Sequence, residues 1–121
     1  WHDSVAHKDS IFYKTYAATR HQLEQTIVNG GYDVIIEVGC GTGDVIANMD
    51  TKIQRYGLDI NAEFVNFCKD TYEVDNCEFL VVDAIFLEEW WKKEGLDKKF
   101  FKPLVSCVNN TLNIMPDGLR G

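Results

Sequence analysis

The 121-residue chain contains only two prolines and no low-complexity segment or internal repeat. Linkers are often rich in proline or repetitive, so this absence predicts one folded domain over residues 1–121, long enough to bury a hydrophobic core. No apolar run approaches the roughly 20 residues of a membrane-spanning helix, so we expect no membrane partner. No signal-peptide pattern opens the chain, and its first residue, Trp1, predicts a processed or shortened start.

Basic residues are also scarce: 12 Lys and Arg stand against 19 Asp and Glu, and the formal net charge is −7. Nucleic-acid-binding domains depend on clustered Lys and Arg that contact phosphates, so we expect no nucleic-acid partner. The lysines between residues 92 and 102 are mixed with acidic residues, as on a solvated surface. An acidic protein remains suited to a cationic or zwitterionic small ligand.

The four cysteines, at positions 40, 68, 77 and 107, form neither a CxxC motif nor a pair with zinc-ligand spacing. We therefore expect no metal site. Scattered cysteines of this kind are typical of buried thiols in a reducing compartment, which predicts a cytoplasmic protein.

The most informative stretch is residues 33–43. It begins as an apolar, β-branched run of strand type and ends in three alternate glycines, Gly39, Gly41 and Gly43. Glycine adopts backbone angles closed to other residues and lets a ligand lie against the main chain. A buried strand that runs into a glycine turn, with a helix to follow, is typical of a nucleotide-type binding site.

Helical and strand patterns alternate along the rest of the chain. Helices are predicted over residues 10–28, 44–49, 62–72 and 87–94, and strands over residues 32–38, 53–58, 77–82 and 104–108. Asn61 is expected to cap the third helix, whose apolar face would run from Phe64 to Tyr72. Trp90 and Trp91 are expected to serve core or helix packing in preference to a stacking platform. This alternation predicts an α/β fold with a parallel sheet, whose ligands collect at the carboxyl ends of the strands.

Polar residues follow each predicted strand at that edge: the glycine turn, Asp59, Asp83 and the segment 109–111. Asp59, about 20 residues after Gly39, is placed to accept hydrogen bonds from ribose hydroxyls of either NAD or S-adenosylmethionine. The dinucleotide fingerprint has its third glycine three residues after the second, and here that position is Asp44. A carboxylate there would oppose a pyrophosphate, so the pattern favours a cofactor without phosphates.

The segment 37–43, Glu-Val-Gly-Cys-Gly-Thr-Gly, resembles motif I of class I S-adenosylmethionine-dependent methyltransferases. In that family Asp59 would bind ribose and Asp83-Ala84 would lie beside adenine. The resemblance covers roughly residues 10–116 and implies a Rossmann-like parallel sheet, strand order 3-2-1-4, with helices on both faces and a helix before it. The complete family fold has further strands, so residues 1–121 would be its N-terminal half, truncated after the fourth strand. Alternatively, another copy or another chain would cover the exposed fourth-strand edge and supply part of the substrate pocket.

The segment from Cys107 to Asp117 is similar to the same region of small-molecule N-methyltransferases of the glycine N-methyltransferase type. There the backbone borders the methionine part of the cofactor, and an arginine on the preceding helix reaches its carboxylate, which would be Arg20. From the residues alone, Tyr16 and Arg20 fit either surface packing and an ion pair or a lid over the ligand. The expected cofactor-binding residues are Tyr16, Arg20, Glu37, Gly39, Cys40, Gly41, Thr42, Gly43, Asp59, Ile60, Asp83, Ala84, Ile85, Val108, Asn109 and Asn110.

The resemblance implies transfer of a methyl group from S-adenosylmethionine to a small-molecule acceptor, with an amine favoured, and S-adenosylhomocysteine as product. No catalytic base is identified: His2 and His7 lie near the ill-defined N-terminus, His21 is expected on the surface of the first helix, and an amine that enters as the free base needs none. Two alternatives remain open: a non-catalytic S-adenosylmethionine-binding or interaction module, and an NAD-dependent oxidoreductase.

Overall fold

The computed structural model describes the backbone of residues 11–107 and the side chains of residues 17–107. The elements, where η denotes a 3-10 helix, are α2 (Ile11–Gly30), β1 (Val34–Val38), η1 (Ile46–Asn48), β2 (Gln54–Asp59), α3 (Ala62–Thr71), β3 (Cys77–Val81), η2 (Ala84–Phe86), α4 (Leu87–Lys93), α5 (Leu96–Lys99) and β4 (Pro103–Ser106). The strand bounds lie within about two residues of those predicted, which is the usual uncertainty at element ends.

The four strands are parallel and lie in the order β3-β2-β1-β4, which confirms the predicted order. Glu37 of the central strand β1 lies opposite Gly57 of β2 and opposite Ser106 of β4. Gly57 in turn lies opposite Phe79 of β3. Because all four strands run the same way, their carboxyl ends meet at one edge of the sheet, as the strand-end argument requires.

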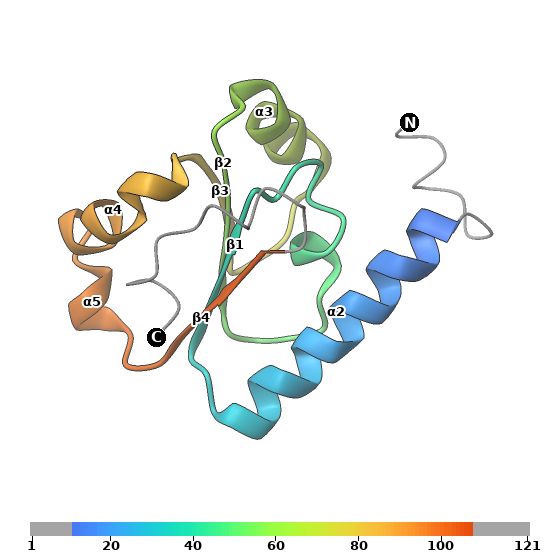
Figure 1. The fold of residues 1–121 in the computed structure, drawn as a ribbon, viewed down its shortest axis with the longest axis horizontal. Coiled ribbons are helices and arrows are strands. Elements are labelled where there is room, and N and C mark those ends of the chain that lie inside the picture. Colours follow the sequence, from blue (N-terminus) through green and yellow to red (C-terminus); the bar gives the residue numbers. More distant parts are fainter. Residues whose placement is uncertain (1–10, 108–121) are drawn as a thin grey trace.

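The sheet separates two hydrophobic cores, because successive side chains of β1 point to opposite faces. The core under α4 and α5 contains Val34, Ile36, Val38, Leu87 and Leu96. The core under α2, η1 and α3 contains Ile27, Ile35, Ile46, Val65 and Cys68. Figure 1 shows this division, with α2 on one side of the sheet and α4 and α5 on the other. Helices therefore cover both faces, as predicted.

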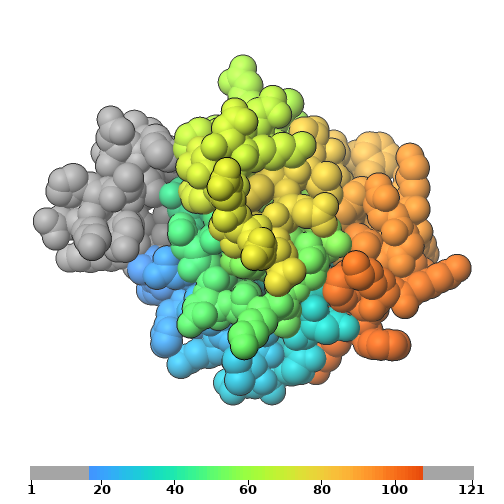
Figure 2. Space-filling model, turned by 180° about the vertical axis from the view of Figure 1, so that it is seen from behind, coloured from blue at the N-terminus to red at the C-terminus, as the bar shows by residue number. Residues whose placement is uncertain are grey.

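The opposite view in Figure 2 shows the segment from β2 to β3 (green to yellow) between α2 (blue) and the α4–α5 pair (orange). Trp90 of α4 packs edge-on against Tyr56 of β2, with ring centroids 5.5 Å apart, so its predicted role in core packing is confirmed. No helix in the described part of the chain is long and apolar enough to cross a membrane.

The helix expected over residues 44–49 is shorter than predicted. It forms only the single turn η1, after which Met49 is extended. The buried guanidinium of Arg55, on β2, donates hydrogen bonds to the carbonyl oxygens of Ile46 (3.0 Å), Met49 (3.2 Å) and Asp75 (3.2 Å). Carbonyls at the end of a helix need partners outside it. Arg55 supplies these partners, and the chain turns towards β2 after one helical turn.

This role of Arg55 predicts the effect of removing its guanidinium. Arg55→Met should lower the free energy of unfolding by about 2–3 kcal/mol, because buried carbonyl groups lose their donors. Lys52→Met removes the same charge from an exposed position and serves as the matched control, with an expected change within about 0.5 kcal/mol. Urea unfolding measures both variants. Equal changes would show that the Arg55 hydrogen bonds contribute little.

Candidate functional site

The turn after β1 has three glycines in the left-handed region, with φ of 69° at Gly39, 57° at Gly41 and 75° at Gly43. Side chains other than glycine rarely adopt these angles, so the alternate glycines predicted from the sequence are required by the backbone. The turn is closed by a hydrogen bond from the Gly43 N–H to the carbonyl of Cys40 (3.0 Å). The Cys40 N–H donates to the carbonyl of Leu58 on β2 (3.0 Å) and anchors the turn to the sheet.

The underside of this turn is packed against α3 and β3. A Cβ added to Gly43 would lie 2.9 Å from Sγ of Cys68 and 3.1 Å from the ring of Tyr72. The Tyr72 hydroxyl donates to the carbonyl of Thr42 (3.0 Å), and the Cys68 thiol donates to the carbonyl of Gly41 (3.4 Å). The turn therefore has no freedom to move inward, and its outer side is left for a ligand.

Asp59, at the end of β2, is the residue that joins the turn to the next helix. Its carboxylate accepts hydrogen bonds from the backbone N–H of Gly41 (2.9 Å) and from that of Asn61 (2.9 Å). Each carboxylate oxygen has two lone pairs, so both oxygens keep one for a further donor. Asn61 caps α3 as predicted, because its side chain accepts from the Glu63 N–H (2.9 Å). The Asp59 carboxylate is 2.9 Å from the backbone nitrogen of Gly41 and remains able to accept hydrogen bonds from hydroxyl groups.

Asp83 follows β3 in the same way. Its Oδ1 accepts from the N–H of Ile85 (3.1 Å), which makes it the cap of η2. The preceding residue, Val82, donates its N–H to the carbonyl of Asp59 (3.1 Å). The two acidic strand ends are thus linked through the backbone and lie side by side at the carboxyl edge of the sheet.

A cavity of about 390 Å³ lies at this edge. It is lined by Val38, Gly39, Gly41, Asp59, Ile60, Asn61, Phe64, Val82, Asp83 and Ala84. The cavity therefore combines a main-chain floor at the glycine turn, apolar side chains and two aspartates. Such a lining, mostly apolar with a few placed polar groups, is usual for small-ligand sites.

Six of the expected site residues line the cavity: Gly39, Gly41, Asp59, Ile60, Asp83 and Ala84. Glu37, Cys40, Thr42, Gly43 and Ile85 belong to the surrounding structure and do not line it. The Cys40 side chain packs in the core, where its contact with the Cys68 thiol and its burial raise the pKa of Cys40. Cys40 is therefore a neutral packing residue at this position.

Phe64 is the cavity-lining residue that the sequence pattern misassigned. We expected it on the apolar core face of α3, but its side chain is 40% exposed and it lines the cavity. Phe64 lies in the first turn of α3 beside the cavity, whereas Val65 and Cys68 belong to the core. Its position three residues after the cap Asn61 is the signal that could have identified it.

Glu37 is fully buried, and neither of its carboxyl oxygens has a hydrogen-bond partner among the described residues. Burial is the main cause that raises the pKa of Glu37 well above its usual value, and the nearby Cys68, Asp44 and Asp59 raise it further. A buried polar group without a partner is unusual, because each one costs about 1–3 kcal/mol. Glu37 lies directly before Val38 and Gly39 in the sequence, and these two residues line the cavity.

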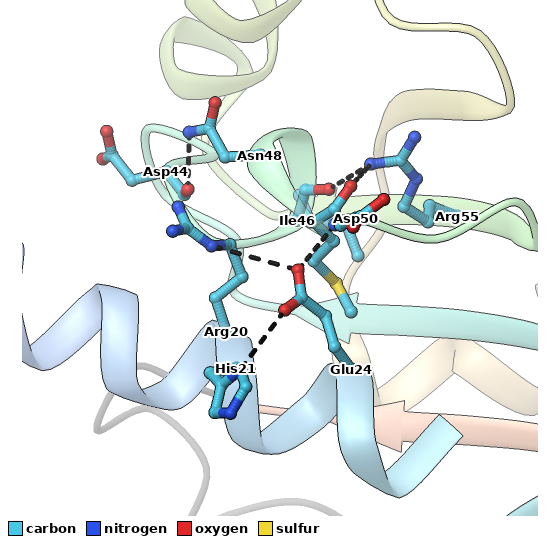
Figure 3. Close-up of polar contacts among 9 residues, drawn as sticks. Arg20, His21, Glu24, Asp44, Ile46, Asn48, Asp50 and Arg55 are labelled. Atoms are coloured by element: carbon cyan, nitrogen blue, oxygen red, sulfur yellow. Dashed lines mark hydrogen bonds and ion pairs between the residues drawn. The ribbon is translucent and has the colours of Figure 1, made fainter. Parts of the chain in front are cut away.

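Arg20, on α2, lies outside the cavity lining. Its Nε is 4.0 Å from Oε2 of Glu24, which also accepts a hydrogen bond from the N–H of Asp50 (2.5 Å). In Figure 3 the Arg20 side chain extends from α2 towards the turn that carries Asp44. The ion pair expected as one alternative is therefore present, and the side chain also points towards the glycine turn.

Four other expected residues are not described by the structure. The Tyr16 side chain and residues Val108, Asn109 and Asn110 lie outside the described part of the chain. Within residues 17–107, no group of three or more His, Cys, Asp or Glu side chains is placed to hold a metal ion. The titratable groups that line the cavity are Asp59 and Asp83. Both accept hydrogen bonds from backbone N–H groups, and these contacts do not identify either as a dedicated base.

A parallel sheet in this order, a left-handed glycine turn after its first strand and acidic residues after the next two strands together define a Rossmann-like cofactor-binding domain. The sequence matches the family described as methyltransferase domain over residues 31–118, and the chain belongs to this family. No curated protein matches the chain.

Two solved structures are similar in fold. The magnesium protoporphyrin IX methyltransferase ChlM from Synechocystis PCC 6803, with bound SAH, has a TM-score of 0.54 and 16% sequence identity over 69% of this chain. The plantazolicin methyltransferase BamL, in complex with a triazolic desmethylPZN analog and SAH, has a TM-score of 0.50 and 20% identity over 63% of this chain. The chain spans 45% and 30% of the lengths of these two proteins, respectively.

The packing beneath the turn predicts that Gly43 cannot be replaced. Gly43→Ala should lower the free energy of unfolding by about 2–5 kcal/mol, since a left-handed alanine costs about 1–2 kcal/mol and overpacking adds about 1–3 kcal/mol. Gly95→Ala is the matched control, because Gly95 has a similar φ of 71° but open space around its Cβ position. Urea unfolding of both variants separates the two contributions. The packing argument fails if the two variants lose equal stability.

Proposed function

We propose that this domain binds S-adenosylmethionine and serves in the transfer of its methyl group to a small-molecule acceptor. The observation that carries the proposal is the cavity bounded by the left-handed glycine turn, Asp59 and Asp83. A phosphate-free nucleoside fits this lining, because hydroxyl groups can donate to the free lone pairs of Asp59 while a base lies among apolar side chains. Membership of the methyltransferase domain family supports the same assignment.

Each cavity residue has a separate part in the proposed binding. Asp59 accepts hydrogen bonds from the ribose hydroxyls, and Asp83 with Ala84 borders the adenine. Ile60 and Phe64, both on the α3 side of the cavity and partly exposed, contact the faces of the base. Gly39 and Gly41 let the cofactor lie against the main chain, because no side chain separates it from the turn.

Charge supports this cofactor over a dinucleotide. Asp44 follows the glycine turn, and its side chain accepts a hydrogen bond from the Thr42 hydroxyl, so a carboxylate lies where a pyrophosphate would bind in a dinucleotide site. Glu37, buried before the turn, adds a second acidic group. S-adenosylmethionine carries a sulfonium, an ammonium and one carboxylate. We place its carboxylate near Arg20, which is the cationic side chain that points towards the turn from α2.

The cofactor supplies a methyl group that its positive sulfur already activates. The protein then has to hold donor and acceptor in line, and orientation of this kind can account for about 7–11 kcal/mol of barrier reduction. An amine acceptor enters as the free base, so the site needs no dedicated base of its own. The proteins of similar fold are named as methyltransferases of plantazolicin and of magnesium protoporphyrin IX, and this favours a small-molecule acceptor.

Part of the acceptor site is proposed to come from outside the described residues. Strand β4 is at the edge of the sheet, and its outer side is a natural pairing site for a further strand, a second copy or another chain. The residues expected to border the methyl group, Val108 to Asn110, follow directly after the described part. A non-catalytic S-adenosylmethionine-binding module is the alternative, and it shares the cofactor site while lacking an acceptor site.

Calorimetry tests the cofactor assignment. The full protein should bind S-adenosylhomocysteine and should not bind NAD, because the turn lacks the third glycine of a pyrophosphate site and has Asp44 in its place. Transfer of labelled methyl from S-adenosylmethionine to a panel of small amines then separates the enzyme from the binding module. Tight NAD binding without S-adenosylhomocysteine binding would overturn the proposal, and binding without transfer would favour the module.

Asp59 provides the mutational test. Asp59→Asn should weaken S-adenosylhomocysteine binding by about 1.5–3 kcal/mol, roughly 10- to 100-fold, because ribose hydroxyls lose a charged acceptor. Asp59→Asn is the sharper substitution, because its amide oxygen keeps an acceptor for one of the N–H groups of Gly41 and Asn61, whereas alanine would leave both without one. Asp70→Asn, on the exposed side of α3, is the control and should bind normally. Unchanged affinity in Asp59→Asn would limit Asp59 to its structural role.

A further inference from the structure

We propose that Cys40 of the glycine turn and Cys68 of α3 form a dithiol that hydrogen peroxide oxidises to a disulfide, and that this oxidation weakens ligand binding at the cavity. The pairing concerns side chains of the described residues and does not depend on which ligand the cavity takes. Its effect on S-adenosylhomocysteine rests on the proposed function.

The first support is that the two thiols meet at one backbone carbonyl. Sγ of Cys68 is 3.4 Å from the carbonyl oxygen of Gly41, and Sγ of Cys40 is 3.8 Å from that same oxygen. The two thiols also contact each other, and both belong to the core beneath the turn. Both are free cysteines. The fold thus brings two reduced sulfur atoms from different elements to one point.

The second support is the space that neighbouring glycines leave for the sulfurs. A Cβ added to Gly43 would lie 2.9 Å from Sγ of Cys68, and one added to Gly57 would lie 3.3 Å from Sγ of Cys40. A side chain at either glycine would therefore crowd one of the two thiols. The sulfur pair lies where the glycine turn, β2 and α3 come together.

The cavity gives a small oxidant a route to this pair. Gly39 and Gly41, the residues on either side of Cys40, line the cavity, and neither has a side chain to cover the main chain. Cys40 is 4% exposed, whereas Cys68 is fully buried behind it. Hydrogen peroxide is close to water in size and can reach the thiols from this side. A ligand that lies on the turn would close the route.

The pair has the two roles that disulfide formation requires. Contact between the thiols raises the pKa of Cys40 and lowers that of Cys68, so Cys68 is the first to ionise. Its thiolate attacks a peroxide oxygen: an S–O bond forms, the O–O bond breaks, and the leaving hydroxide takes up a proton as water. The Cys40 sulfur then attacks the Cys68 sulfur. The S–S bond forms, the S–O bond breaks, and the hydroxyl leaves with the Cys40 proton as a second water. The two sulfurs lose two electrons, which the peroxide gains.

A disulfide at this position would displace the turn. Bonded sulfurs are only about 2 Å apart, so Cys40 and α3 have to approach each other. Cys40 passes this movement on, because its N–H donates to the carbonyl of Leu58 and its own carbonyl accepts from the N–H of Gly43. The Gly41 carbonyl also loses its thiol donors. Since Gly41 lines the cavity and donates its N–H to Asp59, oxidation disturbs the ligand site directly.

Peptide mapping of the full protein tests the pairing. Wild type is treated with hydrogen peroxide, alkylated and digested with trypsin, which places each of the four cysteines of the chain on a different peptide. We expect a linked pair of peptides that joins Cys40 to Cys68 and that dithiothreitol separates. Cys77→Ser removes a partly buried thiol of β3 and is the matched control, which should form the same link. Cys68→Ser should form none. Oxidation without this link would overturn the pairing.

Calorimetry after removal of the peroxide tests the effect on the cavity. Oxidised wild type should bind S-adenosylhomocysteine about tenfold more weakly than reduced wild type, which corresponds to roughly one lost hydrogen bond, and dithiothreitol should restore the affinity. Cys77→Ser should show the same loss. Cys68→Ser keeps a hydroxyl donor for the Gly41 carbonyl, so its affinity should be equal before and after peroxide. A role in packing alone predicts no effect of peroxide on any of the three proteins.

Protection by the ligand tests the route of oxidation. Saturating S-adenosylhomocysteine should slow formation of the Cys40–Cys68 link in wild type severalfold, because the ligand lies over Gly39 and Gly41. The rate is measured from the linked peptide at successive times after addition of peroxide. Equal rates with and without the ligand would contradict oxidation through the cavity.

The outcomes separate two failures. If S-adenosylhomocysteine does not bind reduced wild type, the proposed function is overturned, and peptide mapping still decides the pairing. If it binds reduced and linked wild type equally well, the effect of oxidation is overturned while the proposed function stands. Should Cys68→Ser fail to fold, the comparison of reduced, oxidised and re-reduced wild type decides the question.

Discussion

The left-handed turn at Gly39, Gly41 and Gly43 is the constraint on which the rest of the structure depends. Its backbone angles are rarely adopted by residues other than glycine. Three side chains form hydrogen bonds with the turn: Asp59 at the end of β2, Cys68 of α3 and Tyr72 after α3. The Cys68 and Tyr72 contacts come from the core side, whereas Asp59 holds the turn at the cavity, so the turn is fixed where it lines the cavity. The binding surface and the hydrophobic core therefore share one set of contacts, and a change in one affects the other.

Strand register positions the other site residues relative to this turn. The pairing of β1 with β2 and of β2 with β3 brings the glycine turn, Asp59 and Asp83 to the same edge. A shift of one residue in either pairing would turn a strand's side chains to the opposite face, and the three groups would separate. The same register places Glu37 opposite Gly57, whose missing side chain makes room for Phe79. The sheet thus positions the acidic groups as well as the core.

The sequence was sufficient for features that depend on local pattern: the strand order, the glycine turn, the Asn61 cap and Asp59 at a strand end. It was insufficient where a tertiary contact decides. The helix expected at 44–49 ends early because Arg55, on the following strand, donates hydrogen bonds to the carbonyls of Ile46 and Met49. Phe64 was assigned to the core because an apolar stripe does not reveal that its first residue lines a cavity. Nothing in the spacing indicated that Glu37 would be buried without a partner.

Glu37 illustrates why such a group persists in a folded domain. An apolar residue of similar size would satisfy the same position in β1 and would remove a destabilising buried carboxyl. Sites that bind ligands commonly break the rules that stabilise the fold, because the unsatisfied group finds its partner in the ligand. The surrounding acids and thiols increase the cost of ionising Glu37 further. The protein is therefore less stable than the same fold would be with an apolar residue at this position of β1.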